Sequence, residues 1–562
     1  MKRLLVFFSA VLIGLFGILP SLFSQNFQWA VSCAKGINDD YGVISSNAAG
    51  DVFLTGKWTY PRGIFGNDTL GAGYLPTMLC KLNASGDFQW TKGIRIVGNS
   101  CSSTETFVSA SKLSNDVFLY GNVCGNVYFD TAHFPSSEGQ IFLSRYNGNG
   151  ELIWLKAPAD KEKCAIMRAC FDVEDNAYII GYSSDTMHFS ERLVYPGGFL
   201  SKFTSDGLCT MIKNINVYQG VILQEFCHLK DGGFLLAGKT SAPSVIIETD
   251  TLISSTIYGG DLLLVKYDST GKYLWSKLDG QTGAIKWIFG VTSDNSGNFL
   301  VTGGQFGGTL IFGNHILPNN GSGEMFIVKY DANGNALWAA NSQSNSIYVW
   351  TEPRALFTAS DGKTYVTGGI MNVYDLDTVQ FGSQYLYLNG QSAMYVACYD
   401  SNGNCLGLRY AESDCGSGPE LQFLGTSVTA DNNGNCIVAG QFKRNADFDS
   451  YSLTSMGAKD IFIARCSQIT GLEEPQKTEQ NTLLIYANPN TGKCNITIPD
   501  EFKNDKNLRL QIFDHKGRLI QQAAVENAED KIKLNIEAQA KGMYTAILSN
   551  GKKNYSGKIV FE

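Results

Sequence analysis

The stretch Gly297-Asn298-Phe299-Leu300-Val301-Thr302-Gly303 recurs along the chain, and each copy is followed by a second string. Here the second string is Met325-Phe326-Ile327-Val328-Lys329-Tyr330-Asp331-Ala332-Asn333-Gly334-Asn335-Ala336-Leu337-Trp338. The glycine that ends the first string stands at Gly56, Gly121, Gly181, Gly238, Gly303, Gly368 and Gly440. The second string ends at Trp90, Trp154, Met211, Trp275, Trp338 and Gly407. A repeat of roughly 60 residues predicts an array of supersecondary units.

Each unit reads as four short strands. In the fifth unit we expect strands at 289–293 (A), 298–302 (B), 325–330 (C) and 336–340 (D), because β-branched and aromatic residues fill them. Residues 294–297 and 331–334 carry Asp, Asn and Gly, which favour tight hairpin turns. The B–C and D–A connections fall on the opposite face and look long and irregular. Four-stranded antiparallel units repeated around an axis form a β-propeller.

The seventh unit, Asp460 to Cys466, stops before a D strand, whereas Phe27-Gln28-Trp29-Ala30 matches a D strand that has no unit of its own. We therefore expect the N-terminal strand to complete unit seven and close a ring. The repeats resemble those of seven-bladed propellers in secreted bacterial proteins, over residues 25–467. We expect the tryptophans to pack between neighbouring blades.

Residues 1–24 have the pattern of a secretory signal peptide, with Lys2 and Arg3 before an apolar run that Pro20 interrupts. No other stretch is long and apolar enough to suggest a membrane span after cleavage. The formal charge of −8 argues against nucleic acid as a partner. Fourteen cysteines in an exported chain permit disulfides. Cys80, Cys398, Cys436 and Cys466 fall on strands and read as buried small hydrophobes, while Cys101 and Cys124 are the best candidates for a bond.

After the repeats, residues 468–480 read as a polar linker and residues 481–562 as a small Ig-like β-sandwich. Its motifs are Tyr486-Ala487-Asn488-Pro489-Asn490-Thr491-Gly492, a central hairpin around Asp514 and Gly517, and Gly542-Met543-Tyr544 with Gly557-Lys558-Ile559-Val560 at the end.

These motifs resemble the type A C-terminal sorting domain of the type IX secretion system of Bacteroidetes. Ala487, where the family usually has Pro, and the acidic last residue Glu562 depart from its pattern. The resemblance implies recognition by an outer-membrane translocon after passage through the periplasm, and a secreted or cell-surface location. It assigns sorting-motif positions to Asn488, Pro489, Gly492, Asp514, Gly517, Gly542, Tyr544 and Lys558.

We find no catalytic constellation, metal site or cofactor motif. The five histidines are scattered, and no nucleophile elbow or phosphate-binding loop occurs. The turns at Asp268 and Asp331 resemble calcium loops, but their spacing fits hairpins better. Aromatic residues on the long connections, Trp58, Tyr60, Trp287, Tyr348 and Trp350, either pack under loops or bind a ligand. We predict a non-enzymatic binding or display protein for an extracellular protein or glycan. The alternative is a secreted carbohydrate-active or peptide-degrading hydrolase that uses the same face.

Overall fold

The computed structural model describes residues 27–33, 40–57, 63–70, 74–97, 105–123, 126–129, 132–134, 140–158, 164–189, 191–215, 221–256, 260–280, 284–319, 323–344, 346–372, 377–388, 392–413, 423–469, 481–499, 502–503, 505, 508–514, 518–525, 531–550 and 554–562. These residues form strands and no α-helix, so the predicted all-β class is confirmed. The chain divides into two compact modules, an N-terminal one up to residue 472 and a C-terminal one from residue 473. The predicted signal peptide lies outside the described residues.

The strands of the N-terminal module pair as four-stranded antiparallel repeat units, which we number in chain order. Unit one consists of β2 (Asp40–Ser46), β3 (Val52–Lys57), β6 (Tyr74–Leu82) and β7 (Phe88–Val97). Unit two consists of β8 (Glu105–Ala110), β9 (Val117–Val123), β12 (Gln140–Tyr146) and β13 (Leu152–Lys156). Unit three consists of β14 (Cys164–Phe171), β15 (Ala177–Ser183), β18 (Gly197–Phe203) and β19 (Cys209–Ile215). Units four and five are β20 (Val221–His228), β21 (Phe234–Thr240), β24 (Leu262–Tyr267) and β25 (Tyr273–Asp279), then β26 (Ile285–Ser293), β27 (Phe299–Phe306), β30 (Gly323–Tyr330) and β31 (Ala336–Ser344). Units six and seven are β32 (Val349–Thr358), β33 (Thr364–Asn372), β36 (Ser392–Tyr399) and β37 (Cys405–Ser413), then β38 (Leu424–Ala430), β39 (Cys436–Phe442) and β42 (Asp460–Cys466) with β1 (Phe27–Cys33).

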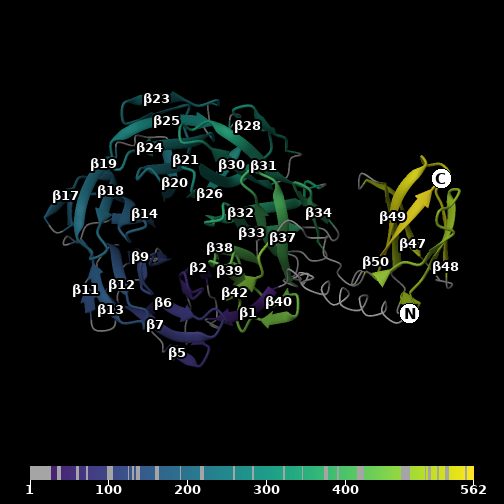
Figure 1. Ribbon diagram of the computed structural model, residues 1–562, viewed down its shortest axis with the longest axis horizontal. Helices are drawn as coiled ribbons and strands as arrows, with labels where there is room; N and C mark the ends of the chain where they lie inside the picture. The colour runs from purple at the N-terminus through teal and green to yellow at the C-terminus, as the bar shows by residue number, and fades with distance from the viewer. Residues whose placement is uncertain are drawn as a thin grey trace, which may run out of the picture. The chain divides into compact units, whose positions relative to one another are not determined.

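The first strands of successive units line the inside of this arrangement. Figure 1 shows the sheets of the N-terminal module following one another around a ring, with β2, β14, β20, β26, β32 and β38 nearest its centre. Strand β20 contacts β14 and β26, β32 contacts β26 and β38, and β38 contacts β2, the first strand of unit one. The beginning and the end of the repeat region are therefore neighbours.

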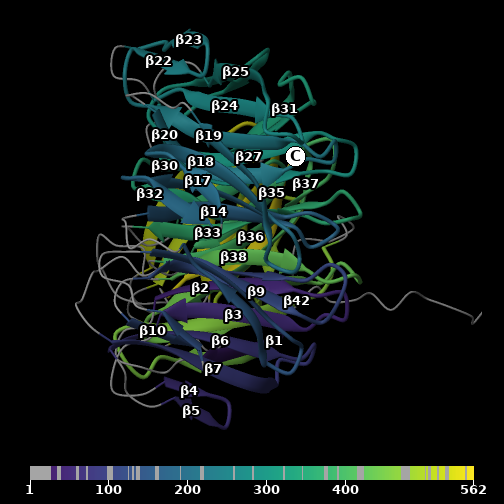
Figure 2. The same cartoon turned by 90° about the vertical axis from the view of Figure 1, so that its left-hand side faces the viewer.

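The N-terminal strand completes unit seven, as predicted. Strand β1 pairs antiparallel with β42, with Phe27 opposite Cys466 and Cys33 opposite Ile461. Asp449, in the connection between β39 and β42, secures it, because the backbone N–H of Phe27 donates to Asp449 Oδ2 at 2.9 Å. Figures 1 and 2 both show β1, in purple, close to β42 of unit seven.

The B–C connections contain short hairpins, which corrects our expectation that they are irregular. The hairpins are β4 (Gly63–Phe65) with β5 (Asp68–Leu70), β10 (Asn126–Phe129) with β11 (Ala132–Phe134), β16 (Met187–Phe189) with β17 (Arg192–Val194), β22 (Ser244–Ile247) with β23 (Asp250–Ile253), β28 (Leu310–Phe312) with β29 (His315–Leu317), β34 (Asp377–Phe381) with β35 (Gln384–Leu388), and β40 (Asn445–Phe448) with β41 (Tyr451–Thr454). A buried aromatic residue, such as Phe312 or Phe448, ends the first strand in most of them. Strands β10, β34 and β40 also pair with the last strand of the preceding unit, which ties neighbouring units together.

The turns at Asp331 and its equivalents are hairpins, as predicted. Asp331 Oδ1 accepts hydrogen bonds from the backbone N–H groups of Asn333 at 2.9 Å and Asn335 at 2.8 Å. These bonds use the carboxylate within its own turn. Gly334 has a φ of 80°, a value that favours glycine. Asp268 makes the same two bonds, to Thr270 and Lys272.

The repeated tryptophans pack between neighbouring units, as predicted. The indole N–H of Trp338 donates to the Ser401 carbonyl in unit six at 3.0 Å, and a Cβ on Gly403 would lie 2.7 Å from its ring. Trp29, Trp90 and Trp154 make the same bond to the C–D turn of the next unit. Gly407 replaces the tryptophan in unit six, where the following unit has no C–D turn because β1 supplies its last strand.

The C-terminal module is a two-layer β-sandwich. One sheet has the order β43 (Asn481–Thr482), β50 (Asn554–Phe561), β49 (Gly542–Ser549), β46 (Leu508–Asp514) and β47 (Leu519–Val525). The other is β44 (Ile485–Tyr486), β45 (Lys493–Thr497) and β48 (Lys531–Asn535). Ile496, Ile512, Leu534 and Leu548 belong to one buried cluster that takes residues from both sheets.

Candidate functional site

Four exposed aromatic side chains lie at the ends of strands of units five and six, and we call them the aromatic rim. They are Trp287, Phe306, Tyr348 and Trp350, with exposed fractions of 51%, 43%, 48% and 42%. Trp287 and Trp350 lie near the start of the first strands of their units, and Phe306 ends the second strand of unit five. All four therefore lie on the face that carries the B–C and D–A connections, beside the inner strands.

Packing across the boundary between units five and six holds Trp350 in place. Its ring meets the Phe306 ring edge-on, with 5.3 Å between centroids. The ring also lies against Gly323, where a Cβ would come within 3.1 Å of it. Gly323 and Trp350 are partners in a parallel bridge between β30 and β32, so backbone pairing sets the position of the ring.

Trp287 lies at the boundary between units four and five. The ammonium group of Lys239, on the second strand of unit four, is 4.4 Å from the centroid of the Trp287 ring. Trp287 pairs with Gly304 on β27, two residues before Phe306. The rim thus combines two tryptophan rings on neighbouring units with a cation at one end.

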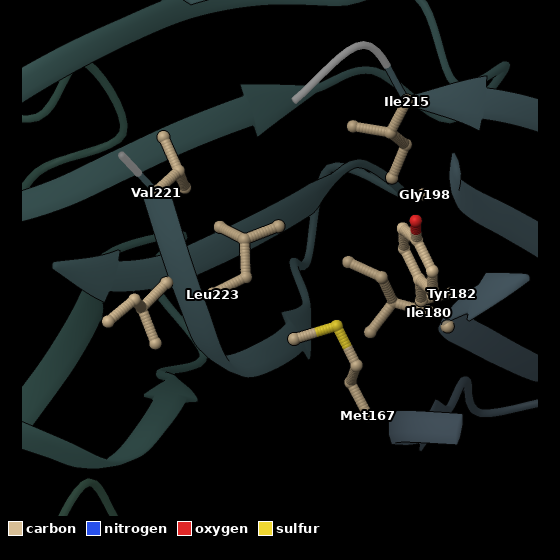
Figure 3. A pocket seen from close by; sticks show the side chains of 9 residues that line it. Met167, Ile180, Tyr182, Gly198, Ile215, Val221 and Leu223 are labelled. Atoms are coloured by element: carbon tan, nitrogen blue, oxygen red, sulfur yellow. The ribbon is translucent and has the colours of Figure 1, made fainter. Parts of the chain in front are cut away.

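An apolar pocket of about 420 Å³ lies between units three and four. Figure 3 shows the side chains of Met167, Ile180, Ile215, Val221 and Leu223 gathered around it, with the Tyr182 ring at one side. Among the described residues that line it, Tyr182 is the titratable one. The pocket can hold an apolar group.

Among the described residues, two ion pairs lie on the inner strands. Arg354 Nη2 is 2.7 Å from Glu352 Oε1 on β32, and the Arg354 guanidinium lies 5.0 Å from the Phe289 ring centroid. Burial raises the pKa of Glu352 above its ordinary value, although the charge of Arg354 opposes this shift. Arg168 on β14 makes two hydrogen bonds to the Glu225 carboxylate on β20, at 2.7 and 3.2 Å. Each carboxylate is matched by an arginine.

Within the part of the chain that the structure describes, no group of three or more His, Cys, Asp or Glu side chains could hold a metal ion. No helix among the described residues is long and apolar enough to cross a membrane. Cys80, Cys398, Cys436 and Cys466 are fully buried, as predicted. The suggested pair Cys101 and Cys124 lies outside the described residues, as do Trp58 and Tyr60.

The sorting-motif residues are partly brought together in the C-terminal module. Asn488 Nδ2 donates to the Lys558 carbonyl at 2.6 Å, and Asn488 Oδ1 accepts from the backbone N–H of Val560 at 2.7 Å. The first motif, which includes Pro489, is thus attached to the last strand. Gly492 has a φ of 98°, and a Cβ there would lie 2.7 Å from the Glu537 side chain.

The other motif residues serve turns and the core. Asp514 Oδ1 accepts the backbone N–H of Arg518 at 3.0 Å, and the buried Tyr544 donates its hydroxyl to the Ala540 carbonyl. Gly542 is exposed at the start of β49, and Gly517 lies outside the described residues.

Sequence reasoning missed Phe306 of the rim and its neighbour Lys239. Phe306 lies four residues beyond the predicted strand at 298–302, and Lys239 follows the repeated Gly238 by one position. The repeat pattern gives no signal at these positions, and the partner ring in each case comes from the next unit, a neighbour that only the fold supplies.

Comparison with known proteins identifies the C-terminal module. Residues 484–562 match the family described as the secretion system C-terminal sorting domain. This tail marks the chain for the type IX secretion machinery and for export to the cell surface or the medium.

The chain also resembles solved structures at low identity. A protein of unknown function from Dyadobacter fermentans is 9% identical, with 78% of this chain and 98% of that chain covered and a TM-score of 0.35. An ulvan lyase of polysaccharide lyase family PL25 is 9% identical, with 73% and 93% covered and a TM-score of 0.38. A leech intramolecular trans-sialidase is 8% identical, with 59% and 65% covered and a TM-score of 0.36. No curated protein matches the chain.

Proposed function

We propose that this chain is an exported, non-enzymatic, seven-bladed β-propeller that binds a carbohydrate polymer at the cell surface or in the medium. In this proposal residues 1–24 direct the chain into the periplasm, and residues 25–467 form the propeller. Residues 468–480 link it to an Ig-like sorting domain at 481–562. Pairing of β1 with β42 and the contact of β38 with β2 support a closed ring.

The aromatic rim carries the binding part of the proposal. Contiguous exposed apolar surface on a rigid scaffold marks an interaction site, and in the rim the rings of Phe306 and Trp350 are in contact. An exposed aromatic ring with hydrogen-bonding groups nearby suits a sugar. The apolar face of the sugar stacks on the aromatic ring, and the sugar hydroxyl groups form hydrogen bonds with the neighbouring polar groups. Lys239 supplies such a group beside Trp287. A standard protein–protein interface involves roughly 20–30 residues on each side. The four rings of the rim form a smaller surface, which favours a sugar over a protein as the ligand.

The alternative is a hydrolase, and one observation favours it. The raised pKa of Glu352 is the property expected of a general acid. A glycosidase, however, ordinarily needs two carboxyl groups flanking the bond. The Glu352 carboxylate is instead paired with a cation, Arg354. This pairing favours a structural role for Glu352.

The test is a binding screen with a product assay on the same samples. The purified full chain is applied to an array of neutral and acidic polysaccharides and incubated with the soluble forms. We expect retention on at least one class of glycan and no increase in reducing ends or unsaturated products. Absence of retention on every glycan would overturn the carbohydrate proposal. Turnover that disappears in Glu352→Gln would establish the hydrolase alternative.

A further inference from the structure

Two cysteines in unit seven are directly opposite each other on neighbouring strands. Cys436 on β39 and Cys466 on β42 are register partners in an antiparallel pair. The Cys466 thiol donates to the Cys436 carbonyl at 3.5 Å. Burial, and then a hydrogen bond between the two thiols, raises the pKa of Cys436 well above its ordinary value. The two sulfur atoms therefore face one another.

This geometry suits a covalent bond. Opposed residues in an antiparallel pair have Cα atoms about 4.5 or 5.5 Å apart. Disulfides span Cα separations of about 4.4 to 6.8 Å, so either type of pair can be bridged without moving the strands. The structure holds both residues as free thiols.

We propose that Cys436 and Cys466 form a disulfide when the chain is exported. The sorting tail marks the chain for export, so the chain must leave the reducing cytoplasm, and disulfides form in the periplasm. The bond would tie together the two strands of unit seven on which β1 docks, since Phe27 pairs with Cys466. It is a modification site at the joint where the ring closes.

The reaction is a thiol–disulfide exchange with a protein disulfide of the oxidoreductase class. The Cys436 thiolate attacks one oxidant sulfur, and the first oxidant thiolate leaves. The Cys466 thiolate then attacks the Cys436 sulfur, the new S–S bond forms, and the second oxidant thiolate leaves. Two protons leave the cysteines, and the oxidant disulfide becomes a dithiol.

Burial determines when this exchange can occur. Both side chains are fully buried in the folded chain, in a cluster with Phe27, Phe462 and the thiol of Cys398. An oxidant can reach them only before β1 covers β42. Since β42 ends the repeat region and pairs with the first strand of the chain, this joint can close only after both ends have been made.

Mass spectrometry of the exported full chain tests the proposal. The protein is harvested into acid, alkylated with N-ethylmaleimide in denaturant, and digested without a reductant. We expect a linked peptide that joins Cys436 to Cys466 and separates on reduction. Recovery of both residues as alkylated thiols, or a bond from Cys436 to Cys398, would overturn the proposal.

A second measurement uses protein that has been fully reduced. Refolding with glutathione disulfide should link the pair at least tenfold faster than the same reagent links the folded, reduced chain. Reduction should lower the thermal midpoint of wild type. It should also lower that of the control variant Cys80→Ala, which removes a buried thiol whose partners on the neighbouring strands are Leu54 and Thr91. It should not change the midpoint of Cys466→Ala. Equal rates in both states, or an equal response of all three proteins, would contradict the inference.

Discussion

Replacing Trp338 by alanine should separate units five and six locally. The Trp338 side chain is 9% exposed, and it is buried in a cluster that takes residues from both units. A tryptophan buries about 150–250 Å², which at about 25 cal/mol/Å² gives about 4–6 kcal/mol as an upper bound. Measured Trp→Ala losses in cores are about 3–5 kcal/mol, a range that already includes cavity formation. We therefore expect a loss of about 3–4 kcal/mol.

A second variant separates the contributions of packing and of hydrogen bonding to this loss of unfolding free energy. Trp338→Phe keeps most of the ring contact with Gly403 but removes the indole N–H that donates to Ser401. Lys329 Nζ donates to the same carbonyl at 3.3 Å, so this oxygen retains a partner. The loss should be about 1 kcal/mol, the usual net value of one hydrogen bond. Leu337→Ala is the control, because Leu337 is 46% exposed and should change stability by less than about 0.5 kcal/mol.

The assay is urea unfolding followed by circular dichroism, together with amide hydrogen exchange. In Trp338→Ala the amides of the C–D turn at 400–405 should exchange faster, because their packing partner is lost. Amides of the equivalent turn at 331–336 should be unchanged. A loss below about 1 kcal/mol, or equal exchange in both turns, would refute the view that each tryptophan joins its unit to the next.

Three further predictions concern the turn carboxylates, the ring joint and the tail. Burial opposes ionisation of Asp294, but hydrogen bonds from Lys329 and the turn lower its pKa below the ordinary value. The ionised Asp294 therefore stabilises the folded chain fully above the unfolded pKa of about 3.9, and this stabilisation is lost as the pH falls through the folded pKa. In Asp294→Asn the free energy of unfolding should fall less steeply as the solution is acidified. An unchanged dependence on acid pH would count against a stabilising role for this carboxylate. Deleting residues 27–33 should expose the edge of β42 and cause aggregation in light scattering, whereas unchanged solubility and thermal midpoint would contradict the closing role of β1. Removing residues 481–562 should leave a folded N-terminal module in the periplasm on cell fractionation, and its appearance in the medium would contradict the sorting role.

Much of the fold could be predicted because its signals are local. The Asp-x-Asn-Gly turns, the strand glycines and the tryptophans repeat at fixed spacing, and the orphan strand at Trp29 indicated the pairing with β42. The absence of a tryptophan at Gly407 could have been predicted as well. Unit seven has no C–D turn, so a tryptophan at this position of unit six would have no turn to pack against.

The B–C hairpins could not be placed from the sequence with the same ease. Strands such as β28 are three residues long, too short to show an alternating pattern, and several pair with a strand of the preceding unit. The aromatic rim was partly predicted, because Trp287, Tyr348 and Trp350 were assigned to the long connections, although the structure places both tryptophans just inside the first strands. Its partners Phe306 and Lys239 depend on contacts between units, which spacing along one chain does not encode.

The most direct test of the proposed function is an equilibrium titration of a retained glycan against the full chain and two variants. The double variant Trp287→Ala/Trp350→Ala removes both tryptophans of the rim, whereas Tyr385→Ala removes a ring that is 54% exposed on the β34–β35 hairpin. If the rim binds the ligand, the double variant should lose at least about 30-fold in affinity, equivalent to about 2 kcal/mol for a central aromatic contact. Tyr385→Ala should bind as wild type does. Equal affinity of the double variant and wild type would contradict the account.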